Sequence, residues 1–197
     1  MIENIFNIPI SSNMLNIDCR AIEKVCYDQK SKDIKGTKKT NILGWQSISF
    51  NKENYDKSHH DLFLDGIIKA LEKFSTEIKC NFNLYVANYW ININSPNSYN
   101  KSHCHPSSFL SGCLYIKVPD KNCGSIIFEN PSCDLISSYM EFYYKLSDEY
   151  SNLFPLNWVH EPIEGKCLIF PSWLKHSVEP NLSKEDRISI SFNVGIS

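Results

Sequence analysis

Two histidines separated by one residue, His103 and His105, are the side chains of this sequence that point most directly to metal chemistry. They lead into an apolar run with the composition of a β-strand, and in extended backbone two side chains spaced in this way point in the same direction. Both imidazoles can therefore face one point, and neutral imidazole is the commonest protein ligand of transition metals. The pair predicts a metal site that needs a third ligand.

A third histidine and an arginine, much further along the chain, supply two more groups for such a site. His176 follows a short strand and a proline-containing turn, and Arg187 begins an alternating strand in which Ser189 and Ser191 share its face. An inward-pointing arginine needs an anion, because burying an unpaired charge is strongly unfavourable. Its planar guanidinium matches a carboxylate. These residues predict a metal site beside a carboxylate-binding site.

Three motifs carry these residues: His-x-His-Pro followed by Leu-Ser-Gly-x-x-Tyr, then Gly-x-x-x-x-Phe-Pro-Ser-x-x-x-His-x-Val-x-Pro-Asn, then Arg-Ile-Ser-Ile-Ser-Phe-Asn. As a set they resemble the motifs of iron(II)- and 2-oxoglutarate-dependent dioxygenases. More closely, the set is similar to a family of small oxygenases from marine bacteria and their phages. With Gly44-Trp45-Gln-Ser and Trp90-x-Asn92, the likeness extends from about Gly44 to Asn193.

This resemblance implies a mainly β fold with flanking helices, a cupin-like double-stranded β-helix (jelly roll) whose mouth holds iron and 2-oxoglutarate. His103 and His176 match metal ligands of the superfamily. Arg187 and Ser189 match its Arg-x-Ser, which binds the distal carboxylate of 2-oxoglutarate, and Tyr115 stands where a second group on that carboxylate is often found. The implied reaction uses Fe(II), 2-oxoglutarate and O2, and it couples decarboxylation of 2-oxoglutarate to succinate with hydroxylation of a small-molecule or protein substrate.

The sequence departs from the superfamily pattern at His105, which stands where a carboxylate ligand is usual. Three arrangements follow from this departure. His105 itself binds the metal, a carboxylate such as Glu129 or Asp134 comes from elsewhere, or water fills the position. Ligation by His105, which gives a three-histidine site, is the favoured interpretation.

The surroundings of the expected metal are less defined. Trp90, Asn92 and Trp173 are expected to line the substrate pocket, but no residue indicates which substrate it takes. Two other functions stay open: a non-enzymatic jelly-roll module with a structural or vestigial metal, and a cupin-like metalloenzyme in which Arg187 binds a different acid.

The elements that position these residues follow from hydrophobic periodicity. Apolar residues at helical spacing predict helices over 16–29, capped by Asn16 or Asp18, and over 61–80. Alternating or apolar runs predict strands over residues 6–10, 44–50, 82–94, 109–118, 125–129, 158–160, 166–170, 176–178 and 187–194. We expect one domain, 1–197, in which residues 1–80 support a β-helix core at 81–197. An aromatic-rich insertion at 130–157 is interpreted as an irregular flap in preference to a lid or a partner-binding surface.

Composition sets the remaining expectations. A net charge of −2 and a pI near 6.3 give no electrostatic footprint for nucleic acid or anionic membranes. The amino terminus lacks the pattern of a signal peptide, and no apolar run is long enough to span a bilayer. The 8 cysteines are scattered without a Cys-x-x-Cys pair, which favours reduced thiols in a cytoplasmic protein. Whether the chain forms a homodimer stays open.

Overall fold

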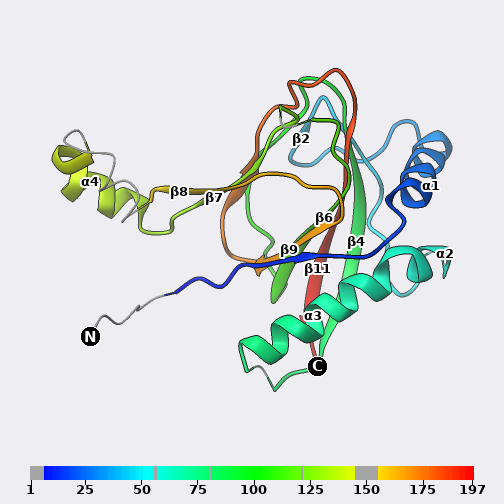
Figure 1. Cartoon of the computed structure of the whole chain (residues 1–197), viewed down its shortest axis with the longest axis horizontal. Coiled ribbons are helices and arrows are strands. Elements are labelled where there is room, and N and C mark those ends of the chain that lie inside the picture. The colour runs from blue at the N-terminus through cyan, green and yellow to red at the C-terminus, as the bar shows by residue number, and fades with distance from the viewer. Residues whose placement is uncertain (1–6, 56, 80, 121, 145–154) are drawn as a thin grey trace.

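Two antiparallel β-sheets face each other, and helices cover the outer side of one of them (Figure 1). The structure is a computed structural model that describes residues 7–55, 57–79, 81–120, 122–144 and 155–197. The larger sheet has the strand order β1 (Ser11–Met14), β9 (Lys166–Pro171), β6 (Leu110–Lys117), β11 (Arg187–Ile196), β4 (Leu84–Asn94) and β3 (Trp45–Gln46). The smaller sheet has the order β2 (Asn41–Ile42), β5 (Tyr99–His103), β10 (His176–Val178), β7 (Ile126–Glu129) and β8 (Asn157–His160).

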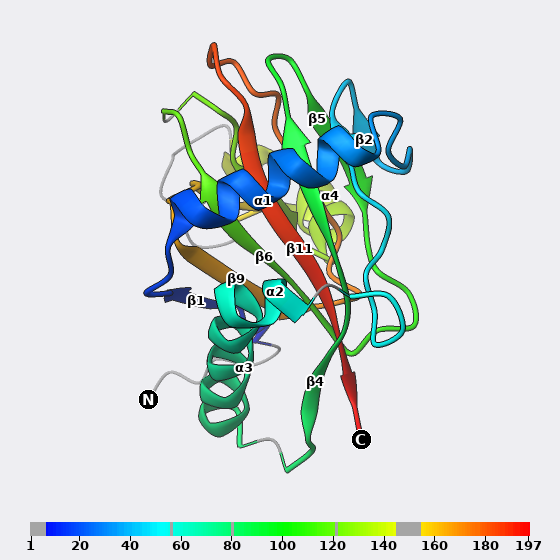
Figure 2. The same cartoon turned by 90° about the vertical axis from the view of Figure 1, so that its right-hand side faces the viewer.

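The helices bury the apolar face of the larger sheet. α1 (Cys19–Lys32) lies across this face over β6 and β11, and α3 (Asp65–Glu77) packs against β4 and β9 (Figure 2). α3 continues a short α2 (Lys57–His59) and one turn of π-helix (His60–Leu64). The predicted cap of α1 is confirmed, since the Asp18 carboxylate accepts a hydrogen bond from the Ala21 N–H at 3.0 Å. None of the described helices is both long and apolar enough to cross a membrane.

Period-two alternation separates the two faces of the central strands. On β11 the helix-facing residues Ile188, Ile190, Phe192 and Val194 are fully buried. The other face of β11 carries Arg187 and the polar residues that follow it at every second position, and it looks toward the smaller sheet. Position 112 on β6 requires glycine, because an added Cβ there would lie 2.1 Å from the Phe192 ring.

The segment 130–157 is more regular than predicted. Its described part contains a helix, α4 (Cys133–Tyr144), and the predicted irregular flap is wrong for these residues; residues 145–154 lie outside the described part of the chain. α4 extends beyond β7 and β8, at the end of the molecule opposite α1 and α3 (Figure 1). Because it covers neither sheet, none of residues 133–138 is buried, and the sequence shows no apolar stripe.

Two predicted strands differ at the amino-terminal side. The opening strand lies at Ser11–Met14, after the predicted 6–10, where it pairs with β9. Of the predicted strand 44–50, only Trp45–Gln46 and a bridge from Phe50 to Tyr89 pair with β4. β1, β2 and β3 therefore extend the two sheets, and the amino-terminal part is built into the same fold as the rest.

Candidate metal centre

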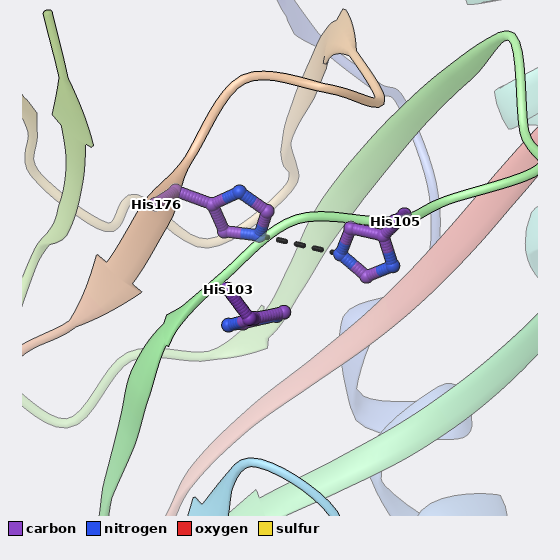
Figure 3. Close-up of side chains that lie close together, drawn as sticks. All are labelled: His103, His105 and His176. Carbon is purple, nitrogen blue, oxygen red and sulfur yellow. Dashed lines mark hydrogen bonds between the residues drawn. The ribbon is translucent and has the colours of Figure 1, made fainter. Parts of the chain in front are cut away.

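Three histidines converge on one point at the smaller sheet (Figure 3). His103 ends β5 and pairs across the strands with His176, which begins β10, while His105 lies in the loop after β5. Their nearest ring nitrogens all lie within 4.8 Å of one another, and the Nε2 atoms of His105 and His176 are 3.3 Å apart. Two imidazole bonds of about 2.1 Å at right angles would place their nitrogens roughly 3 Å apart. The spacing is thus suited to a single ion.

The local backbone around the pair differs from the sequence interpretation. His103 ends a separate strand, β5, and His105 lies in the loop after it, so the pair does not lead directly into residues 109–118. Pro106 and Ser107, whose φ is 68°, break the extended backbone between β5 and β6. His103 and His105 still face one point together with His176, although His105 lies in a loop and the predicted continuous strand is absent from this described segment.

Hydrogen bonds determine which ring nitrogen of His103 and of His176 is available to a metal. Nδ1 of His103 lies 2.7 Å from the carbonyl oxygen of Lys101, and Nδ1 of His176 lies 2.9 Å from that of Leu174. Because a carbonyl only accepts, each Nδ1 carries the proton and each Nε2 keeps its lone pair.

Burial keeps all three rings neutral. It lowers the pKa of His103, the pKa of His105 to about 4 and the pKa of His176 to about 3, with mutual repulsion of the rings adding to the effect on the last two. At neutral pH the three side chains are therefore in the form that binds a metal.

Aromatic rings enclose the histidines on the protein side. Trp90 lies 5.6 Å from His105, measured between ring centroids, and Phe170 and Phe128 lie 4.9 and 5.9 Å from His176. These contacts fix the ring orientations and shield the site from water.

Neither candidate carboxylate joins the three histidines in the described part of the chain. Glu129, at the end of β7, accepts a hydrogen bond from the Ser102 hydroxyl. Asp134 is exposed on α4. Among the described residues, the donor set at this point consists of imidazoles alone, and ligation by His105 stays a prediction.

A pocket of about 380 Å³ opens beside the histidines, between the two sheets. Its lining includes all three of them together with Arg187 from β11. Among the described residues, no aspartate or glutamate lines it. The pocket therefore combines a metal-binding donor set with a fixed positive charge, and its described lining offers no acidic side chain to neutralise that charge.

Arg187 is buried at the pocket end, with 2% of its surface exposed. Its Nη1 donates to the carbonyl oxygens of Cys123 and Gly124 at 2.6 and 2.8 Å. Gly124 has a φ of +87°, and an added Cβ would lie 2.4 Å from the carbonyl oxygen of Glu179, so this turn requires glycine. No described carboxylate forms an ion pair with Arg187. A buried guanidinium in this state is complementary to an anionic ligand.

Ser189 and Tyr115 lie next to Arg187 on the pocket floor. They are cross-strand partners on β11 and β6, and both line the pocket. Burial raises the pKa of Tyr115 well above its usual range, so the phenol keeps its proton and can donate a hydrogen bond.

Two of the three expected substrate-pocket residues line the pocket, and one does not. Trp90 and Asn92 lie on the inner face of β4. Trp173 is outside the lining and 56% exposed, which corrects the expectation. It lies in the turn between β9 and β10, where the neighbouring Leu174 takes the inward position and is 2% exposed.

Several lining residues were not predicted. They are polar side chains on the inner faces of β4 and β11, with two from the loop before β2: Asn88, Asn94, Asn193, Lys39 and Thr40. Ser191, which was expected to share the face of Arg187, lines the pocket as well. The signal for the three asparagines is in the sequence, because they alternate with the buried apolar residues of their strands.

The side chains present fit Fe(II) and 2-oxoglutarate. Neutral imidazoles suit a divalent transition metal, and the arginine suits a carboxylate. Asn92 gives an independent indication of a ligand, since its Oδ1 is buried without a hydrogen-bond partner among the described residues. Its Nδ2 is 3.0 Å from the Ser191 hydroxyl, so only one end of the amide is satisfied by the protein.

Solved structures confirm the predicted double-stranded β-helix. A Pseudomonas putida prolyl-4-hydroxylase aligns with a TM-score of 0.64 at 10% identity, over 96% of this chain and 94% of its own. HygX from Streptomyces hygroscopicus, with nickel and 2-oxoglutarate bound, aligns at 0.60 and 12% identity, over 95% and 83%. The viral collagen prolyl hydroxylase of Paramecium Bursaria Chlorella virus-1, a 2-oxoglutarate complex, aligns at 0.57 and 12% identity, over 94% of each chain. At these identities the likeness shows the fold.

The family is shown by sequence. No curated protein matches the chain. A family model described as "Putative 2OG-Fe(II) oxygenase" matches residues 88–193, a segment that contains the three histidines, Arg187 and most of the pocket floor. Because the match spans more than half of the chain, the protein belongs to this family of 2-oxoglutarate-dependent oxygenases, which use Fe(II), 2-oxoglutarate and O2.

Proposed function

We propose that His103, His105 and His176 bind Fe(II) through three imidazole nitrogens. The observation that carries this proposal is the convergence of three neutral histidines beside an arginine that has no acidic partner among the described residues, in a pocket whose described lining contains no acidic side chain. The Nδ1 hydrogen bonds of His103 and His176 support it, because they leave each Nε2 available.

Arg187, Ser189 and Tyr115 form the proposed site for the distal carboxylate of 2-oxoglutarate. Nη1 of Arg187 is held by two carbonyl oxygens, which leaves the donors on Nη2 and Nε for an anion. The Ser189 hydroxyl and the protonated Tyr115 phenol are the neighbouring donors on the same floor.

Fe(II) and 2-oxoglutarate, when bound, supply the oxidative chemistry: O2 is consumed, 2-oxoglutarate becomes succinate and CO2, and one oxygen atom enters the substrate as a hydroxyl group. The chain orients the reactants and keeps the site dry. Arg187 fixes the distance between the far carboxylate and the histidines. Trp90 and Phe170 hold the imidazoles and exclude water from their sides.

The proposed substrate is a small molecule or a protein side chain that reaches the open side of the pocket. Both kinds occur among proteins of this fold: a hygromycin B complex is known for HygX, and other structures are prolyl hydroxylases. The pocket volume of about 380 Å³ accommodates 2-oxoglutarate together with part of a second molecule.

Metal and cosubstrate binding test the assignment separately. Equilibrium dialysis with Mn(II), followed by calorimetric titration of 2-oxoglutarate, should show at least tenfold weaker metal binding for His176→Ala. Arg187→Gln should bind the metal normally and 2-oxoglutarate at least tenfold more weakly, since it loses a charged hydrogen-bonding group.

His60→Ala is the matched control for the metal assignment. It disrupts the other described group of potential ligands, the partly exposed His60, Asp61 and Asp65, and should change neither affinity. Metal binding by His176→Ala at wild-type affinity, or its loss in His60→Ala, would contradict the proposed centre.

A further inference from the structure

We propose that the substrate of this oxygenase carries an anionic group, a carboxylate or a phosphate, that binds Lys39 at the rim of the pocket. In this arrangement the amides of Asn88 and Asn193 hydrogen-bond to the polar body of the substrate. The inference rests on the proposed function, because it places the substrate beside the metal and 2-oxoglutarate.

The charge of the pocket is opposite to the charge of the molecule. The chain has 22 acidic and 20 basic residues, yet the described lining contains Lys39 and Arg187 and no acidic side chain. Arg187 is engaged by the distal carboxylate of 2-oxoglutarate in the proposed function. Lys39 then remains as a second cation, and no described carboxylate forms an ion pair with it. A pocket of this kind favours an anionic substrate.

The backbone of Lys39 is held in place at the rim. Its N–H donates to the Asn41 side chain at 3.0 Å, and Asn41 in turn donates to the carbonyl oxygen of Gly44 at 3.1 Å. The next residue, Thr40, accepts a hydrogen bond from the N–H of Lys101 on β5 at 3.0 Å. The side chain of Lys39 is exposed while it lines the same pocket as the three histidines. A ligand in this pocket can therefore contact Lys39 and lie beside the metal centre.

The register of β4 and β11 orders the pocket floor. Arg187 is opposite Asn94, Ser189 is opposite Asn92, Ser191 is opposite Trp90, and Asn193 is opposite Asn88. Trp90 packs on His105, so the metal centre is near the third of these pairs. The proposed 2-oxoglutarate site occupies the first two pairs.

The fourth pair lies beyond the metal centre, on the side away from Arg187. There Asn193 donates to the Asn88 side chain at 3.1 Å and accepts from the Ser111 hydroxyl at 2.9 Å. These hydrogen bonds hold the two amides in place. The Asn88 amide nitrogen donates in neither of them, so it can donate to a ligand. Such fixed amides bind hydroxyl, carbonyl and phosphoryl oxygens. A small anion rich in oxygen atoms thus matches both Lys39 and this floor.

Nuclear relaxation by Mn(II) tests this inference directly. Protein loaded with Mn(II) and 2-oxoglutarate is titrated with inorganic phosphate, observed by phosphorus resonance, and separately with carbon-13-labelled acetate. We expect saturable relaxation of at least one anion, and the anion that binds more tightly identifies the group as phosphate or carboxylate. Lys39→Met should weaken that binding about threefold to tenfold, as expected for one charged contact at a partly solvated site.

Lys38→Met is the matched control, because Lys38 is the adjacent exposed lysine and does not line the pocket. It should bind the anion as the wild type does. Equal binding by the wild type and Lys39→Met, or no saturable response to either anion, would overturn the inference alone. Failure of the Mn(II)-loaded wild type to bind 2-oxoglutarate would instead contradict the proposed function, and the inference would fall with it.

Discussion

At the scale of single residues, the metal centre depends on imidazoles that stay neutral without a metal. Desolvation is the largest cause of the lowered pKa of all three rings, and it is strongest for His176, which is 4% exposed. An unfolded chain has no such burial, so its histidines titrate near pH 6.5. The folded protein therefore has its metal ligands ready at neutral pH and loses stability when they are protonated.

This difference predicts a pH dependence for the metal-free protein. Between about pH 4 and 6 the unfolded state binds more protons than the folded state, so the free energy of unfolding should rise with pH. The pKa of His176 is about 3 when folded, and this residue alone should contribute nearly one proton of difference, roughly 1 kcal/mol per pH unit, in that window.

Urea unfolding at several pH values measures this slope. His176→Gln should have a slope smaller by about one proton, because it removes the histidine whose pKa is lowered most by burial. Equal slopes for the wild type and His176→Gln would contradict the burial account.

Residue patterns predicted the side chains on regular strands better than those in turns and loops. Arg187 was predicted from alternation alone, because a strand residue among buried neighbours has only two faces available. Trp173 was placed wrongly, since it lies in a turn where no period indicates which side chain points inward. Lys39 gave no signal, because it lines the pocket only through the pairing of β2 with β5.

At the scale of elements, the turn at Cys123 and Gly124 positions Arg187 without touching the proposed cosubstrate site itself. Gly124→Ala should disturb this turn, because alanine disfavours a φ of +87° and its Cβ meets the Glu179 carbonyl oxygen. We expect the dissociation constant of 2-oxoglutarate to rise about threefold to thirtyfold, because the variant loses one or two of the hydrogen bonds that orient the guanidinium. Mn(II) affinity should be unchanged.

Gly165→Ala separates this effect from general strain. Gly165 also has a positive φ, +80°, but it lies in the loop before β9 and does not line the pocket. Calorimetry should show lower stability with normal 2-oxoglutarate binding for this variant. Weaker 2-oxoglutarate binding in both variants to the same extent would show that Gly124 has no specific role.

Element prediction succeeded where burial imposes a period and failed where it does not. α1, the amphipathic α3 and the long strands β4 and β11 all pack against the main core, and the sequence predicts each of them. β5 was missed because it is short, polar and only half buried. α4 was missed because it covers no sheet.

At the scale of the whole molecule, stability and binding are assigned to opposite faces of the same strands. The helices bury the apolar face of the larger sheet, while the inner face carries the pocket. Substitutions on the pocket face can therefore change binding with little loss of packing. The two facing sheets, and the site between them, depend on pairing between strands that are far apart in the sequence. The sequence indicates this pairing only through its resemblance to the family.

Thermal unfolding should show a separate increase in Tm for each of the two ligands when they are added one after the other. At about 100 times their dissociation constants, each ligand stabilises the folded protein by about 2.7 kcal/mol, which corresponds to a rise in Tm of about 5–10 °C. We expect Mn(II) and then 2-oxoglutarate to raise the Tm of the wild type. Arg187→Gln should show the full first rise and at most about half of the second, and His176→Ala should show at most about half of the first, because tenfold weaker binding lowers the stabilisation by about 1.4 kcal/mol. A second rise in Arg187→Gln equal to that of the wild type would contradict the proposed anchor.

The central claim is that three histidines bind the metal. In this account 2-oxoglutarate chelates the same metal while its far carboxylate binds Arg187. A crystal structure of the protein with Mn(II) and 2-oxoglutarate tests it most directly. We predict one ion within about 2.0–2.3 Å of a ring nitrogen of His103, His105 and His176, and the far carboxylate of 2-oxoglutarate on the Arg187 guanidinium. A carboxylate such as that of Glu129 in place of His105, or 2-oxoglutarate bound away from Arg187, would contradict it.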